Sequence, residues 1–66
     1  MENVIANRIR ERRLQLGLSQ GQLAIKLKIN KGTVSAWERG VSEPKIISAL
    51  SLAKAFGTTV EELFSP

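Results

Sequence analysis

The chain has 66 residues, of which ten are basic and six acidic, so its net charge is +4. It contains no cysteine and no histidine, which excludes disulfides, thiolate metal sites and histidine-based acid–base catalysis. A basic excess is typical of proteins that bind a polyanion, although a soluble basic domain without such a partner would have the same composition. There is no apolar run of about 18 residues and no visible signal peptide, so we expect one cytoplasmic domain over residues 1–66 without a membrane span.

The first predicted helix runs from about residue 4 to residue 16 and is followed by Gly17. Its apolar stripe at helical spacing consists of Ile5, Ile9 and Leu16. Most of the remaining surface is basic. This basic face is either a solvated helix surface or a site at which one arginine, Arg10, reaches a phosphate group.

A second helix is predicted after Ser19, whose hydroxyl can cap the free amides of the first turn. Gln22 lies three residues further on, so the two residues fit a capping box. Gln20 is the first residue of this helix, where free amides and the positive end of the helix dipole favour a phosphate. The alternative for Gln20 is a polar residue that merely starts the helix.

A third helix is predicted from Lys31, capped by Asn30 and ended by Gly40. Val34 and Trp37 lie on one side of it, and we expect Trp37 to be in the core rather than stacked on a base. The opposite side is small, polar or basic and is made of Lys31, Gly32, Thr33, Ser35 and Ala36. A short helix with such a face can enter the major groove of DNA and contact bases there.

The segment after this helix offers further polar contacts. Arg39, Ser42 and Lys45 are predicted to contact the sugar-phosphate backbone, together with Arg10, Ser19 and Gln20. Pro44 precedes a fourth helix, where its missing amide costs nothing. The predicted apolar positions of this helix are Ile46, Ala49, Leu50, Ala53 and Phe56.

A short fifth helix is predicted after Thr59, which forms a second capping box with Glu62. Leu63 is expected to pack inward together with Val60. Phe64 either closes the core or is partly exposed for contact with a second copy.

In this order the residues resemble the lambda-repressor-like, Cro/CI-type helix-turn-helix domains, also called the XRE family. The resemblance covers nearly the whole chain and rests on five segments. These are residues 8–10 with Arg13, residues 16–20 with 22–24, residues 34–40 with Pro44, residues 52–57 and residues 60–64. It implies a compact all-α domain of five helices in which the second and third helices form the helix-turn-helix.

The resemblance also implies roles for particular residues. Arg13 is expected to form an ion pair with Glu38, which would tie the first helix to the third; the alternative is two unrelated surface charges. Gln20 is expected to clamp a phosphate. Lys28 departs from the family, which usually has glycine at this position in the turn, so we expect strain of about 1 kcal/mol there.

The favoured function is a sequence-specific regulator of transcription that binds double-stranded DNA, most simply a bacterial or phage repressor. The resemblance implies a homodimer on a two-fold operator, and the candidates for its interface are Thr58, Thr59, Glu61, Leu63 and Phe64. The alternative is a protein-interaction module of the same fold that sequesters a partner protein. We expect no enzymatic activity, no cofactor and no metal, because the residues offer no nucleophile–base pair and no ligand cluster.

Overall fold

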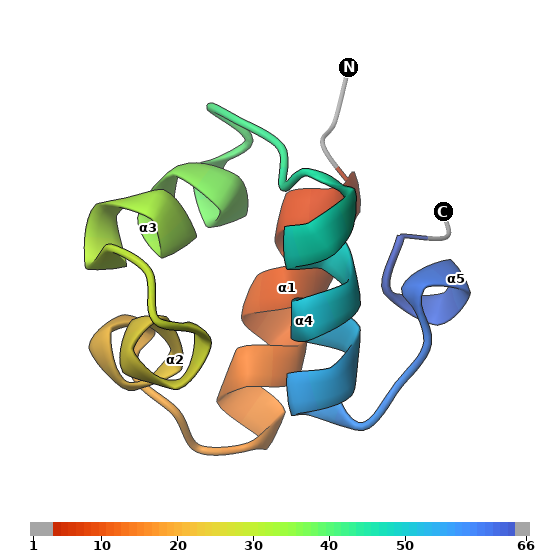
Figure 1. Cartoon of the computed structure of the whole chain (residues 1–66), viewed down its shortest axis with the longest axis horizontal. Coiled ribbons are helices and arrows are strands. Elements are labelled where there is room, and N and C mark those ends of the chain that lie inside the picture. The colour runs from red at the N-terminus through yellow and green to blue at the C-terminus, as the bar shows by residue number, and fades with distance from the viewer. Residues whose placement is uncertain (1–3, 65–66) are drawn as a thin grey trace.

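The computed structural model describes residues 4–64, with side chains from Arg8 onward, and it contains five helices within this range. They are α1 (Val4–Gln15), α2 (Gln20–Leu27), α3 (Lys31–Arg39), α4 (Ile46–Phe56) and α5 (Val60–Leu63). The helices α2 and α3 lie together on one side of α1 and α4, and α5 lies on the other side (Figure 1). This arrangement confirms the predicted all-α fold with its helix-turn-helix.

One apolar cluster joins all five helices. Ile9 of α1, Leu23 of α2, Val34 of α3, Leu52 of α4 and Leu63 of α5 are each completely buried. The remaining buried members are Ala24, Trp37 and Phe56. Burying a large aliphatic side chain stabilises the fold by about 1.5–3 kcal/mol, so these contacts hold together helices that are too short to be stable alone.

The first turns of α2 and α3 are capped as predicted. The Ser19 hydroxyl accepts a hydrogen bond from the Gln22 amide at 3.0 Å, and the Gln22 side chain accepts one from the Ser19 amide at 2.8 Å. The Asn30 side chain accepts from the Gly32 amide at 2.7 Å. These bonds satisfy amides that a helix start leaves free, which explains why each helix begins where it does.

The turn between α2 and α3 contains a strained residue. Lys28 has a φ of 59° and is the only non-glycine residue with positive φ in the described part of the chain. Its amide donates to the carbonyls of the last turn of α2, which fixes this left-handed conformation. The left-handed conformation expected at this position is therefore present, with a lysine in place of glycine.

Three predictions about apolar positions were wrong. Leu16 lies after the end of α1 and is 50% exposed, because the chain turns at Gly17 before a further helical turn can form. Ile46 and Leu50 are 73% and 57% exposed, whereas Leu52 of the same helix is buried. The packed side of α4 is thus rotated relative to the predicted stripe, with Ala49, Ala53 and Phe56 as the shared positions; the prediction for Ile5 lies outside the described side chains.

The start of α5 forms only half of the predicted capping box. The Thr59 hydroxyl accepts a hydrogen bond from the Glu62 amide at 3.1 Å, as predicted. The Glu62 carboxylate, however, accepts from the Thr58 hydroxyl at 2.8 Å instead of returning to the Thr59 backbone. The neighbouring threonine side chain replaces a main-chain amide as the donor.

Candidate nucleic-acid interface

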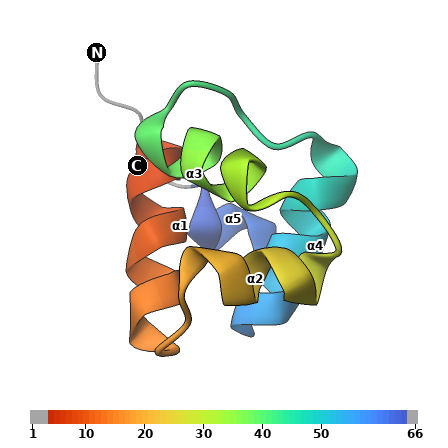
Figure 2. The same cartoon turned by 90° about the vertical axis from the view of Figure 1, so that its left-hand side faces the viewer.

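The outward side of α3 is the candidate reading surface. An α-helix with its side chains is about 10–12 Å in diameter, so it fits the roughly 12 Å width of a major groove. Val34 and Trp37 hold the helix to the core at 0% and 5% exposure. The five predicted base-contacting residues are all at the surface, with Lys31 and Gly32 exposed and Thr33, Ser35 and Ala36 half-buried. In Figure 2 this helix and α2 face the viewer.

Gly32 is needed by the cap of α3 as well as by the surface. A Cβ atom at this position would lie 3.1 Å from Oδ1 of Asn30, the atom that accepts the Gly32 amide hydrogen bond. A larger residue would therefore crowd the capping side chain. The same lack of a side chain leaves the backbone at the start of α3 open to close approach by a ligand.

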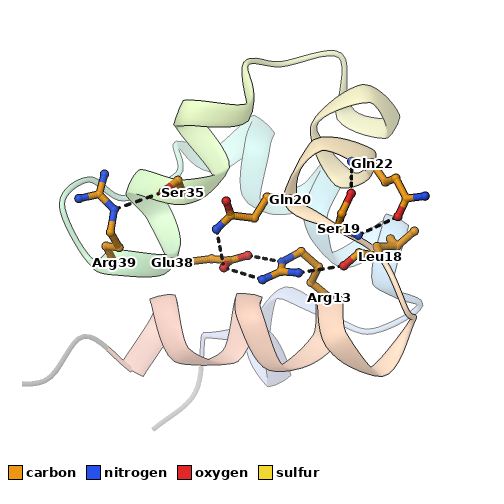
Figure 3. A network of polar contacts seen from close by, with 8 residues as sticks. All are labelled: Arg13, Leu18, Ser19, Gln20, Gln22, Ser35, Glu38 and Arg39. Atoms are coloured by element: carbon orange, nitrogen blue, oxygen red, sulfur yellow. Dashed lines mark hydrogen bonds and ion pairs between the residues drawn. The ribbon is translucent and has the colours of Figure 1, made fainter.

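A bidentate ion pair connects α1 to α3. Nε and Nη2 of Arg13 donate to Oε2 and Oε1 of Glu38 at 2.6 and 3.0 Å (Figure 3). Nη1 of Arg13 also donates to the Leu18 carbonyl at 2.8 Å, so the guanidinium is bonded on three sides. The two side chains are only 9% and 4% exposed. The predicted pair is present and fixes the end of α3 to α1.

Gln20 extends this network to α2. Its Nε2 donates to Oε1 of Glu38 at 3.1 Å, a contact that the sequence reasoning missed (Figure 3). The sequence indicated only that Gln20 begins α2. The second amide hydrogen of Gln20 remains available for a phosphate, so the two roles are compatible.

The surroundings keep Glu38 ionised. Burial alone would raise the pKa of its carboxyl, but the hydrogen bonds from Arg13 and Gln20 and the positive charges of Arg13 and Arg10 outweigh this effect. The pKa of Glu38 therefore lies below its ordinary value of 4.5. The hydrogen bond to Glu38 raises the pKa of the Arg13 guanidinium in turn.

Of the residues predicted to contact phosphates, Arg39 is bonded to the outward side of α3. Nε of Arg39 donates to the Ser35 hydroxyl at 3.2 Å, which positions the guanidinium beside the reading surface (Figure 3). The Ser35 hydroxyl keeps its own hydrogen for donation to an acceptor. Arg10, Ser42 and Lys45 are exposed. Ser19 is also exposed, and its hydroxyl hydrogen is free because the capping bond uses only the oxygen.

The prediction that Leu63 contributes to a dimer interface is wrong. Leu63 is completely buried in the core, so its side chain is not available to a second copy. Thr58 and Thr59 are engaged in the hydrogen bonds at the start of α5. Glu61 is exposed and Phe64 is half-buried against the core.

Large apolar side chains of α4 are exposed instead. Ile46 is 73% exposed and Leu50 57% exposed. Ile46 also borders a hollow of about 230 Å³ whose other walls are Glu43, Pro44, Ala49, Val60 and Phe64. The helical pattern of α4 did contain too many apolar residues for one buried side, and this was the signal that could have revealed the surface.

Within residues 4–64 no helix is both long and apolar enough to cross a membrane. In the same part of the chain no three acidic, cysteine or histidine side chains are grouped as metal ligands would be.

Comparison with known proteins agrees with this architecture. A family model described as helix-turn-helix matches residues 9–63. The chain belongs to this family, the Cro/CI-type helix-turn-helix domains. Among solved structures, the P22 c2 repressor in complex with synthetic operator 9T superposes with a TM-score of 0.90 at 30% identity, covering 97% of both chains.

Two relatives show how family members differ in length. YgzD of Bacillus subtilis, an uncharacterized HTH-type transcriptional regulator, is 34% identical over 58 residues, which cover 88% of each protein. An HTH-type transcriptional regulatory protein of Aeropyrum pernix is 36% identical over 64 residues. The match covers 97% of this chain but only 18% of the Aeropyrum protein, so the same domain occurs both nearly alone and within longer proteins.

Proposed function

We propose that the chain is a sequence-specific DNA-binding regulator of transcription, without catalytic activity, that acts as a repressor. The observation that carries this proposal is the outward side of α3, which is small, polar and cationic and is held to α1 by the Arg13–Glu38 pair. The operator complex of the similar P22 c2 repressor supports it. A regulator of this kind works on DNA, so we also propose a cytoplasmic location and a single functional domain over residues 1–66.

The proposed base readout is modest and uses few side chains. Lys31 at the start of α3 can donate to O6 or N7 of guanine. Thr33 and Ala36 offer methyl groups to the thymine methyl, and Ser35 can donate to a base acceptor. Gly32 lets the backbone approach the base edges. Since no glutamine or asparagine lies in this surface, shape and deformability of the DNA contribute to specificity.

The proposed backbone contacts set the salt dependence. Six residues would contact phosphates, namely Arg10, Ser19, Gln20, Arg39, Ser42 and Lys45. Only three of these, Arg10, Arg39 and Lys45, carry a positive charge. Each phosphate neutralised contributes about −0.9 to the slope of log K against log salt, so one copy should give a slope of about −3.

Two copies on a two-fold operator would place their α3 helices about 34–36 Å apart. We propose that the second copy packs on the surface formed by Ile46, Leu50 and Phe64, with Thr58, Thr59 and Glu61 at its rim. The exposure of two large aliphatic side chains on a domain of this size supports self-association, because so small a domain buries little surface alone. Sedimentation of Leu50→Glu and Phe64→Ala with operator DNA tests this surface, and an unchanged 2:1 complex in both variants would refute it.

The experiment that tests the function is selection of bound fragments from a random duplex pool, followed by titration of the selected duplex at several salt concentrations. Enrichment of a two-fold sequence and a steep decrease of affinity with salt are the expected results. Lys31→Ala should change the base preference at one base pair, whereas Arg39→Ala should weaken binding to all DNA sequences equally. Weak and salt-insensitive binding without enrichment would refute the proposal and favour a protein-interaction module.

A further inference from the structure

Two adjoining hollows lie between α4 and the end of α2. The larger has a volume of about 390 Å³ and is lined by Lys26, Leu27, Lys28, Ser51, Lys54 and Ala55. The smaller has a volume of about 200 Å³ and is lined by Leu27, Ile29, Trp37, Ile47, Ser48 and Ser51. Both hollows include Leu27 and Ser51, so together they form one groove, which we call the α2–α4 groove.

The α2–α4 groove follows one side of α4. Ile47, Ser51 and Ala55 recur every four residues and therefore lie along one face of this helix. The opposite wall is the end of α2 and the turn that leads to α3, and α2 and α4 are in contact. The only contribution of α3 is Trp37, which is on the buried side of that helix. The groove is thus separate from the outward side of α3.

One end of the groove is strongly cationic. Lys26, Lys28 and Lys54 are all exposed there, and neither α2 nor α4 contains an acidic residue. Within residues 8–64 the recorded ion pair is Arg13–Glu38, so these lysines have no carboxylate partner. Lys26 and Lys54 lie in the last turns of their helices, where a positive charge is favoured. That effect explains each position singly, but it leaves three like charges around one hollow.

The other end of the groove is mainly apolar, with Ser48 and Ser51 as its polar members. Ile47 is 78% exposed at its wall, and Leu27, Ile29 and Trp37 form the rest of the apolar lining. A closed apolar cavity of about 150 Å³ accommodates a benzene molecule. A hollow of this size therefore holds one large apolar side chain.

We propose that the α2–α4 groove binds an acidic segment of a partner protein that carries one apolar anchor residue. Three ammonium groups, from α2, from the turn after it and from α4, match several carboxylates spaced along a chain, whereas a single small organic acid would neutralise only part of the cluster. The apolar end supplies the anchor pocket that short peptide motifs use. Because the groove does not include the outward side of α3, the partner and DNA can bind at the same time. The groove and the proposed DNA-binding function are therefore tested independently.

The test uses the peptide Glu-Glu-Leu-Phe-Glu-Glu as a probe, in which one of the two apolar side chains serves as the anchor. Trp37 is the only tryptophan of the chain and lines the groove, so its fluorescence reports occupancy directly. We expect a saturable change with a Kd below about 1 mM. A peptide with glutamine in place of glutamate, and one with serine in place of Leu-Phe, should each bind at least about tenfold more weakly, a loss of about 1.4 kcal/mol.

Two charge-reversal variants serve as a matched pair. Lys54→Glu should weaken peptide binding at least about tenfold and leave DNA binding unchanged, while Lys45→Glu, outside the groove, should keep peptide binding. Ile47→Ser should weaken binding of the Leu-Phe peptide but not of the serine peptide. Both lysines and Ile47 are exposed, and circular dichroism checks that the variants fold.

The proposal is overturned if no saturable signal occurs up to about 1 mM peptide. It is equally overturned if the glutamine or serine peptide binds as tightly as the probe, or if Lys45→Glu loses as much affinity as Lys54→Glu. Absence of DNA binding in the unmodified chain would refute the proposed function and leave the peptide result standing.

Discussion

Replacing Glu38 by alanine removes the carboxylate that binds the buried Arg13 guanidinium. The change deletes two hydrogen bonds from Arg13, at 2.6 and 3.0 Å, and one from Gln20 at 3.1 Å. Arg13 keeps only its bond to the Leu18 carbonyl, and the residue is 8% exposed. A positive charge is then left in a poorly solvated position without a counter-charge.

Breaking a buried ion pair by removing one partner costs about 3–5 kcal/mol. The remaining bond to Leu18 offsets part of this, so we expect a loss of about 3 kcal/mol in the free energy of unfolding. A domain of 66 residues has a total stability of roughly 3–10 kcal/mol, so the variant loses a large share of it. For a domain of this size the melting temperature should fall by roughly 12–24 °C.

Urea denaturation followed by Trp37 fluorescence measures this loss, because Trp37 is 5% exposed in the folded chain. Glu43→Ala is the matched control, since Glu43 is exposed in the segment between α3 and α4. The double variant Arg13→Met with Glu38→Leu should recover part of the stability, because it leaves no unpaired charge. A loss below about 0.5 kcal/mol in Glu38→Ala, the range of ordinary surface substitutions, would refute the reasoning.

Three further predictions concern stability. The pKa of Glu38 is lower in the folded chain than its ordinary value of 4.5, so the ionised carboxylate contributes fully to the free energy of unfolding above that pH. This contribution is lost as the pH falls further, through the lowered pKa of the folded chain. Glu38→Gln should therefore make the free energy of unfolding depend less on pH in the acid range, and an unchanged dependence would contradict this. Lys28→Gly should raise the free energy of unfolding by about 1 kcal/mol, because it relieves the left-handed strain at φ 59°, and a lower urea midpoint would argue against that strain. Asn30→Ala should cost about 1 kcal/mol through loss of the α3 cap, which thermal melting can measure; an unchanged melting temperature would show that the cap is dispensable.

Local signals explain what could be predicted from the sequence. The caps at Ser19 and Asn30 depend on neighbours only a few residues away, so the residue pattern was sufficient. The left-handed position at Lys28 was expected only through the family resemblance. The Arg13–Glu38 pair joins residues 25 apart and was predicted only through the family resemblance.

Tertiary packing explains what could not be predicted. In α4 five apolar residues match a helical stripe, but the helix packs on Leu52 and leaves Ile46 and Leu50 at the surface. Periodicity alone cannot decide between two overlapping stripes, because the choice depends on which side the other helices cover. The contact from Gln20 to Glu38 could not be predicted from the position of Gln20 at the start of α2, because the two residues belong to different helices.

The most direct test of the account is mapping of amide chemical shifts by NMR when the selected duplex is added to the labelled chain. We predict that the large changes fall on Lys31–Arg39, on the start of α2 and on Ser42 and Lys45, while Ser51, Lys54 and Ala55 of the α2–α4 groove change little. Changes confined to the groove, or no saturable change on α3, would contradict the claim that the outward side of α3 reads DNA.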